Sequence, residues 1–429
     1  MKISSLTPRF VSTPSRPLLI SALVCSLGLI PSHAVPISWT GTTGNWSDST
    51  WTGGTPPDAQ NAEVVITAAG SAVDLQGTSR TVGSLVIGNA AGATLTGTGG
   101  GNLIFSSSVG NATLTRALIN TNTSIGAGVT LNSSVDVTVN SSLSTRYLSF
   151  DGKVTGTGGI NIKSSSGKVQ LNNSANDFSG GVKIESGGNL NVAANAYLGT
   201  GNLTVNGGAT IQTTGASTLH VGGSQIWAGD FITATNSSSL NMGTAAVNLN
   251  GGVRTVTLNT NTSGRTTTVG GVISNGGLGV TNAGTFKSSL ILTGANTYAG
   301  GSTVNSGILA TSGTGTFGVG DITVADLAAL TLGNSTSIGD TAGLTFGNST
   351  INLNYTGTET LALLFSSVTS TSMTAGIGYT ATDLNNFFGG TYFTGTGLIT
   401  VAAIPEPATY AAILGGVALA GMVIARRKR

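Results

Sequence analysis

Short runs in which apolar and polar residues alternate fill most of the chain. Clear examples are residues 134–140 (SVDVTVN), 202–213 (NLTVNGGATIQT) and 247–260 (VNLNGGVRTVTLNT). Each run has Val, Ile, Leu or Thr at every second position and is bounded by Gly, Asn or Ser, which is typical of half-buried strands. Helical patterns occur only near the end of this region, at residues 359–368 and 381–390. The pattern therefore predicts an almost entirely β body.

The scarcity of proline and the abundance of glycine favour one kind of β architecture. Residues 58–404 contain no proline, which suits a nearly continuous sheet because proline cannot donate to a strand ladder. Glycine makes up 66 of 429 residues, roughly twice the usual share, and supplies corners with positive φ. We expect a parallel β-helix, in which every strand pairs above and below. A β-sandwich, or an array of sandwiches, is the alternative, because closely spaced strands fit it too.

The chain contains an internal repeat at an offset of 120 residues. Residues 169–190 align with residues 289–309, and the two copies extend to about 150–213 and 269–332. The matched positions are Asn176 with Asn296, Phe178 with Tyr298, and Gly180 and Gly181 with Gly300 and Gly301. Repetition of strand-and-turn units at a fixed period indicates a solenoid.

The second copy, LTGANTYAGGSTVNSGIL, resembles the autotransporter-associated β-strand repeat, also called the passenger-associated transport repeat. Residues 39–54 are similar to the usual mature start of such proteins. The resemblance implies a right-handed parallel β-helix exposed on the cell surface. At the roughly 20 residues per coil that the family implies, the body would form ~18 coils at ~4.8 Å each.

The N-terminus has the pattern of a secretory signal peptide covering residues 1–34. Three basic residues precede an apolar run at residues 18–30, and small residues lead up to a cleavage site after Ala34. An uncleaved anchor and a lipoprotein signal at Cys25 are the alternatives. Cleavage would remove the chain's one cysteine, and with it disulfides and thiolate chemistry.

The C-terminus, residues 404–429, carries the most specific signal. Pro405, Glu406 and Pro407 precede an apolar stretch at residues 408–425, long enough at ~27 Å for a single transmembrane helix. The chain then ends in a basic cluster expected to stay cytoplasmic: Arg426, Arg427, Lys428 and Arg429.

This order of elements resembles the PEP-CTERM sorting signal. The resemblance implies export by the general secretion machinery in a Gram-negative-type bacterium and a temporary anchor in the inner membrane. An exosortase would then process the protein near Pro405, Glu406 and Pro407 and deliver it to the cell surface or extracellular matrix. A plain tail anchor is the alternative.

Charge is unevenly distributed between the ends and the body. The chain's formal charge of +2 arises from the termini, whereas residues 35–404 have 10 Lys and Arg against 14 Asp and Glu, a charge of −4. The basic residues of the body are few and dispersed, so nothing predicts nucleic-acid binding.

Candidate chemistry in the body is sparse. His220 is its one histidine and is expected at a polar or corner position next to Gly222 and Gly223. The Gly318–Asp321 turn is only faintly similar to calcium-binding repeats. Asp151 with Lys153, and Lys183 with Glu185, are expected to form solvated ion pairs.

Three tryptophans lie close together near the start of the body: Trp39, Trp46 and Trp51. They predict an N-terminal cap, with a sugar-binding aromatic platform as the alternative.

From the sequence we therefore expect a solenoid body at residues 35–403 with no catalytic residue, cofactor or metal site, in a structural or adhesive protein that is not an enzyme. An exopolysaccharide or cell-surface glycan is the partner class considered. The alternative function is a polysaccharide-binding or polysaccharide-degrading protein on the same β-helix scaffold.

Overall fold

The computed structural model describes residues 35–402, except residues 69, 118, 119, 164, 165, 194, 236 and 237. The predicted signal peptide at residues 1–34 and the predicted sorting signal at residues 404–429 lie outside the described residues. Within the described part, no helix is long and apolar enough to cross a membrane.

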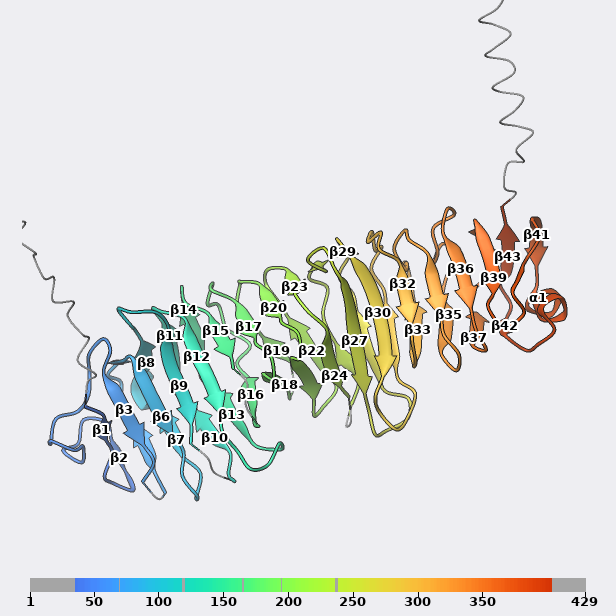
Figure 1. The fold of residues 1–429 in the computed structure, drawn as a ribbon. Coiled ribbons are helices and arrows are strands. Elements are labelled where there is room, and N and C mark those ends of the chain that lie inside the picture. Colours follow the sequence, from blue (N-terminus) through green and yellow to red (C-terminus); the bar gives the residue numbers. More distant parts are fainter. Residues whose placement is uncertain are drawn as a thin grey trace, which may run out of the picture. The chain divides into compact units, whose positions relative to one another are not determined.

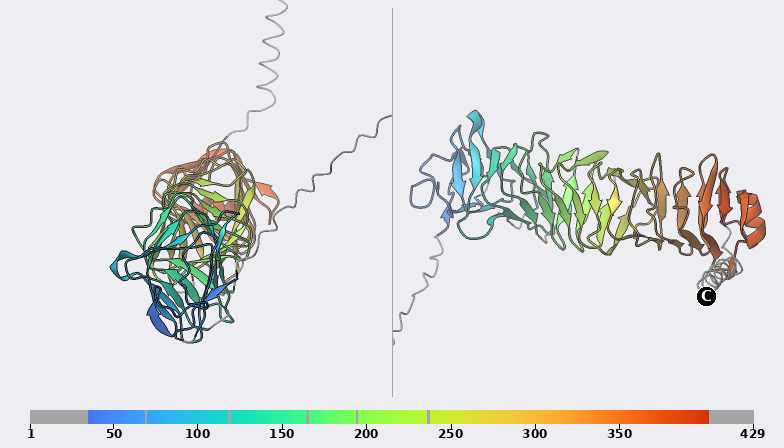
Figure 2. Two further views of the ribbon diagram at one scale, coloured as in Figure 1. Left: turned by 90° about the vertical axis from the view of Figure 1, so that its left-hand side faces the viewer. Right: turned by 90° about the horizontal axis from the view of Figure 1, so that it is seen from above.

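The described residues form an all-β solenoid of about 14 turns, and its strands succeed one another along the body in chain order (Figures 1 and 2). The 11-stranded sheet consists of β1 (Ile37–Ser38), β3 (Glu63–Ile66), β6 (Ser84–Ile87), β9 (Ala112–Arg116), β12 (Val135–Val139), β15 (Ile160–Ile162), β17 (Val182–Ile184), β20 (Leu203–Val205), β23 (Gln225–Trp227), β26 (Val247–Asn248) and β29 (Ile273–Ser274).

The 16-stranded sheet runs along the body beside it and consists of β2 (Thr43–Asn45), β4 (Ala72–Asp74), β7 (Thr94–Thr96), β10 (Thr123–Ile125), β13 (Tyr147–Phe150), β16 (Lys168–Leu171), β18 (Asn189–Val192), β21 (Thr210–Thr213), β24 (Phe231–Ala234), β27 (Val253–Asn259), β30 (Gly277–Asn282), β32 (Ser302–Val304), β34 (Ile322–Val324), β36 (Gly343–Phe346), β39 (Leu363–Ser366) and β40 (Thr371–Ser372).

Three smaller sheets complete the turns. The four-stranded sheet holds β14 (Val154–Gly156), β11 (Gly128–Leu131), β8 (Asn102–Phe105) and β5 (Arg80–Val82). The nine-stranded sheet holds β19 (Ala196–Tyr197), β22 (Ser217–His220), β25 (Leu240–Asn241), β28 (Thr266–Val269), β31 (Ser289–Leu292), β33 (Ile308–Thr311), β35 (Ala329–Leu332), β37 (Thr350–Leu353) and β42 (Phe393–Gly395). The three-stranded sheet holds β38 (Thr358–Leu361), β43 (Leu398–Val401) and β41 (Gly376–Tyr379).

Successive turns pair in parallel, which confirms the solenoid and contradicts the alternative of a β-sandwich, whose sheets are antiparallel. Antiparallel pairs occur at the ends of the body, as in β39 with β40 and β41 with β43. The turns vary in length, since Ser302 pairs with Ile322 twenty positions later but Leu85 pairs with Leu114, 29 positions later. The prediction of ~18 coils was therefore too high. The right-handed sense stays a prediction.

Inward-facing Val, Ile, Leu and Phe side chains fill one continuous core. Strands such as β12 alternate buried and half-buried positions, as the period-two pattern predicts. Large aromatic rings contribute to this core, and the fully buried phenylalanines include Phe105, Phe150, Phe178, Phe231, Phe317 and Phe346.

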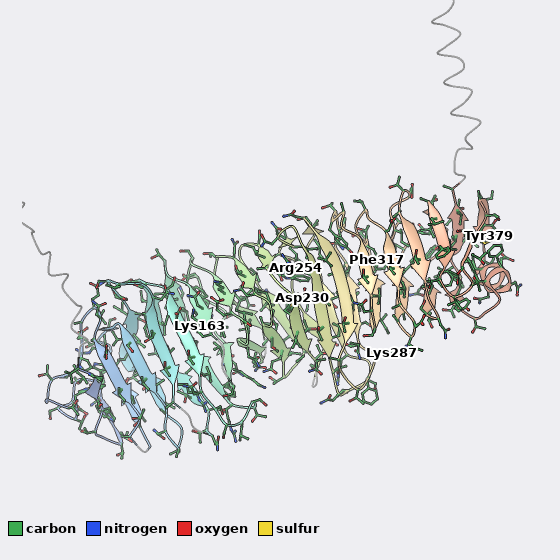
Figure 3. All side chains as sticks on the ribbon, in the orientation of Figure 1. Lys163, Asp230, Arg254, Lys287, Phe317 and Tyr379 are labelled. Carbon is green, nitrogen blue, oxygen red and sulfur yellow. The ribbon has the colours of Figure 1, made fainter. Side chains whose placement is uncertain are left out.

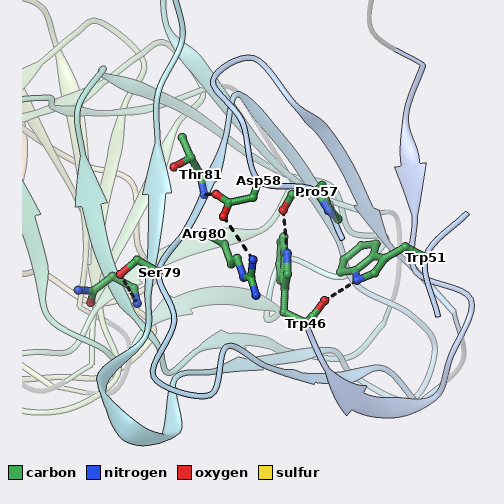
Figure 4. Close-up of polar contacts among 8 residues, drawn as sticks. Trp46, Trp51, Pro57, Asp58, Ser79, Arg80 and Thr81 are labelled. Carbon is green, nitrogen blue, oxygen red and sulfur yellow. Dashed lines mark hydrogen bonds and ion pairs between the residues drawn. The ribbon is translucent and has the colours of Figure 1, made fainter. Parts of the chain in front are cut away.

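Three tryptophans close the N-terminal end, as predicted. Trp39, Trp46 and Trp51 are all buried, and the Trp51 ring lies 5.1 Å from Trp39 and 4.8 Å from Trp46. The indole of Trp46 donates to the carbonyl of Pro57 at 2.8 Å, and that of Trp51 donates to the carbonyl of Trp46 at 2.7 Å (Figure 4). A sugar platform needs exposed ring faces, so the alternative interpretation of these residues is wrong.

The C-terminal end is closed by the helix α1 (Ala381–Phe388). Thr380 caps this helix by accepting from the amide of Asp383, and Phe388 packs at 5.1 Å against Phe346. The prediction of a helix at residues 381–390 is thus confirmed. The one at residues 359–368 is wrong, because that segment forms β38 and β39, which pair with β43 and β36.

The matched asparagines of the two repeat copies, Asn176 and Asn296, have the same structural role. The Asn176 amide accepts from the amide of Val154 in the preceding turn at 2.8 Å and donates to the carbonyl of Tyr197 in the following turn at 3.0 Å. Asn296 likewise accepts from the amide of Ile273 at 2.7 Å and donates to the carbonyl of Thr316 at 2.6 Å. Each side chain therefore makes the hydrogen bonds to the two neighbouring turns that a strand backbone would otherwise make. It does so at a point where its own turn forms a corner and has no third strand.

A buried carboxyl lies near the C-terminal end, on β38. The side chain of Glu359 is fully buried, and its Oε2 accepts from the amide of Ser337 at 2.8 Å. Burial raises the pKa of Glu359 to about 7, despite backbone hydrogen bonds that act to lower it. Sequence reasoning missed this group because it assigned Glu359 to a helix.

Replacing Asn296 with alanine should leave the amide of Ile273 and the carbonyl of Thr316 without their partner. We expect Asn296→Ala to lower the free energy of unfolding by about 2–4 kcal/mol, measured by urea denaturation followed by circular dichroism. The control is Asn305→Ala, whose exposed side chain makes one long contact of 3.5 Å to Thr281 and should change stability by less than about 0.5 kcal/mol. Equal effects of the two substitutions would contradict the role assigned to Asn296.

The raised pKa of Glu359 predicts that the stability of the protein falls as the pH rises. An ordinary glutamate loses its proton near pH 4.5, so between pH 4.5 and about 7 the unfolded chain releases a proton that the folded chain keeps. The free energy of unfolding therefore decreases over that pH range. Glu359→Gln should remove this decrease and stabilise the protein at pH 8 by up to about 3 kcal/mol. Urea midpoints measured from pH 4 to 8 check this. Thr358→Ala, an exposed neighbour, should keep the original slope, and an unchanged slope in Glu359→Gln would refute the assignment.

Candidate functional site

Charged side chains are spread along the body, as the labelled residues Lys163, Asp230, Arg254 and Lys287 show (Figure 3). One group gathers on the outer face of the 11-stranded sheet. Lys163 lies 3.3 Å from Asp136 of an earlier turn and 3.8 Å from Glu185 of a later one. Lys183 reaches Glu185 at 2.9 Å, which confirms that predicted pair.

The two carboxylates of this network are held in their charged form. Burial acts to raise the pKa of Asp136, but hydrogen bonds from Asn161, Asn111 and Lys163 outweigh it, and the pKa is lowered. The pKa of Glu185 is also lowered, chiefly by the hydrogen bond from Lys183. Neither carboxyl is therefore arranged as a proton donor at neutral pH. Because the lysines are well exposed, each ion pair is worth less than about 1 kcal/mol.

The other predicted ion pair is wrong. Lys153 contacts Asp177 of a later turn at 2.6 Å. Asp151 instead accepts hydrogen bonds from Ser124 at 2.7 Å and from Asn172 at 2.7 Å, on neighbouring turns. Both side chains thus contact residues of neighbouring turns and not each other.

The turn with a faint similarity to calcium-binding repeats has a structural role. Asp321 accepts from the amide of Gly343 in the following turn at 2.8 Å. Asn202, at the equivalent position of the first copy, accepts from the amide of Ser224 at 2.9 Å. Among the described residues, no group of three or more His, Cys, Asp or Glu could hold a metal ion.

A buried arginine was not foreseen from the sequence. The guanidinium of Arg116 is fully buried and donates to the carbonyls of Asn140, at 2.7 Å, and Thr121. Burial, together with the nearby charge of Arg146, lowers the pKa of Arg116 to about 10, so it stays charged at neutral pH. Its carbonyl partners indicate that it stabilises loops.

His220 lies at a concavity of about 320 Å³ on the outside of the nine-stranded sheet. Its ring stacks on that of Tyr197, one turn earlier, with centroids 4.2 Å apart and planes 5° apart. Thr218, Asn241 and Thr244 also line the concavity. The prediction of a plain corner residue missed this stack, because Tyr197 is 23 positions away and turn lengths vary.

The remaining sequence-predicted site residues lie outside the described residues. They are the cleavage residue Ala34, the sorting motif Pro405, Glu406 and Pro407, and the basic cluster Arg426, Arg427, Lys428 and Arg429. Their roles stay predictions.

Comparison with protein families gives two matches to one family, described as Passenger-associated-transport-repeat, at residues 162–192 and 288–310. These segments contain Asn176 and Asn296, the residues that bridge neighbouring turns. Comparison with curated proteins and with solved structures gave no match. Two segments of the β-solenoid are thus similar to the passenger-associated transport repeat, and this similarity suggests an exported, surface-associated protein.

Proposed function

We propose that the protein has a structural or adhesive role at the cell envelope or in the extracellular matrix. The observation that carries this proposal is that the residues of the repeat signature serve the stacking of turns. Asn176 and Asn296 bridge turns, and Phe178 and Tyr298 are buried in the core. The repeats therefore build length and leave the outer face free for contacts.

We also propose that residues 404–429 act as a PEP-CTERM signal processed by an exosortase. The described fold supports this division, because β43 ends at Val401 and is paired with both β38 and β41. Cleavage near Pro405 would thus remove no strand of the described fold. Export through the general secretion machinery and temporary anchoring by residues 408–425 belong to the same proposal.

A polysaccharide-degrading function has weaker support. Such enzymes need a carboxylic acid that keeps its proton as well as a second carboxylate across a cleft. Asp136 and Glu185 are both held ionised, and the buried Glu359 lies in the core. We therefore propose that the protein is not an enzyme.

The sorting proposal predicts the mature ends of the protein. The chain should be expressed in exosortase-competent cells, which are then fractionated, and its ends should be determined by mass spectrometry. We expect a start directly after Ala34, loss of Arg426–Arg429, and recovery from the cell surface or medium. Replacing Pro405, Glu406 and Pro407 with alanine should retain the basic tail and hold the protein in the inner membrane.

The control for that experiment is Thr394→Ala, an exposed change in the C-terminal cap that should be processed normally. Intact protein with Arg429 at the surface, or normal processing of the triple-alanine chain, would contradict the sorting proposal.

A further inference from the structure

Tyr197 and His220 form one stacked pair of rings on the nine-stranded sheet. Tyr197 covers one face of the imidazole. Thr218 of β22 pairs with Asn241 of β25, and this register places Gly243 of the next turn beside His220. Gly243 has φ +79°, and a Cβ there would collide with the carbonyl of Leu219. The position that follows His220 in the next turn therefore carries no side chain, and Gly243 lines the concavity.

The polar groups around this space have unused hydrogen-bonding capacity. Asn241 uses its Oδ1 to accept from the amide of Gly243 at 2.9 Å. Its Nδ2 and the ring nitrogens of His220 have no hydrogen-bond partner among the described residues. Thr218, which is half-buried, and Thr244, which is exposed, also line the concavity and carry hydroxyls.

We propose that this concavity binds a residue of a neutral polysaccharide. A pyranose ring has a face of C–H bonds, which the electron-rich face of an aromatic ring attracts, and an edge of hydroxyls. The imidazole face would receive the C–H bonds, and Asn241, Thr218 and Thr244 would bind hydroxyls. The volume, about 320 Å³, lies at the small end of the usual range for ligand pockets and suits one or two sugar units.

The chemistry of the site argues against other ligands. The lining includes no Asp, Glu, Lys or Arg, so a charged ligand would find no permanently charged partner there. A purely aromatic ligand would stack on His220 but leave the amide and hydroxyls without partners, which carries a desolvation cost. The inference deepens the proposed adhesive role by giving it a ligand class.

The experiment measures binding of the full-length chain, purified in a detergent without a sugar headgroup, to immobilised polysaccharides. The probes are the neutral dextran, galactomannan and hydroxyethylcellulose, with the anionic alginate for comparison. We expect binding to at least one neutral probe. His220→Ala and Tyr197→Ala should weaken it at least tenfold, whereas His220→Phe, which keeps a flat ring, should stay within threefold of the original.

Two further variants separate loss of the site from loss of the fold. Thr244→Tyr adds a ring at the exposed rim without removing a packed side chain, and it should block binding. Phe286→Ala removes an aromatic side chain that is 44% exposed and does not line the concavity, and it should bind normally.

Three outcomes would overturn the proposal: no binding to any neutral probe, binding to alginate alone, or undiminished binding by both His220→Ala and Thr244→Tyr. Because this assay uses purified protein, its outcome does not depend on how the protein is sorted in cells. A failure to bind polysaccharide would therefore not contradict the sorting proposal, and incorrect sorting would not contradict the binding proposal.

Discussion

Hydrogen bonds between the backbones of successive turns hold this protein together, and they require every turn to present its strands in register with the one before. Most of the polar side chains with a clear role serve that requirement. Asp321 and Asn202 each accept from a backbone amide of the following turn, and Asn176 and Asn296 replace a missing strand. Even the corner glycines serve it: Gly181 and Gly301 have φ near +75°, and a side chain there would collide with the next turn.

This constraint explains why much of the fold could be predicted. Alternating residues, the missing proline and the two repeat copies all reflect stacked parallel strands, and the tryptophan cap follows from the need to cover an exposed end. The length of each turn could not be predicted, because the loops between the strands differ in length from turn to turn. The segment around Glu359 was wrongly predicted to be a helix, because its strands are stabilised by partners far away in the sequence. β38 pairs with β43, more than 35 residues downstream, and β39 pairs with β36, about 20 residues upstream.

The candidate site was harder to predict for the same reason. Which residues meet on the outside depends on the register between turns, and unequal turn lengths hide it. Lys153 meets Asp177 and not Asp151, and His220 meets Tyr197 across 23 positions. The sequence marks the residues that build the scaffold, because they recur. His220 is the one histidine of residues 35–404, and the concavity beside it is also lined by Gly243, where a Cβ would collide with the carbonyl of Leu219.

The whole described body forms one stacked solenoid, although only residues 162–192 and 288–310 match the repeat family. Hydrogen–deuterium exchange of the full-length chain, followed by mass spectrometry, can test whether the turns outside these two segments are stacked as well. We expect slowly exchanging strand amides that recur every 19–30 residues from β3 to β39. Protection confined to the two matched segments, with fast exchange elsewhere in the body, would contradict it.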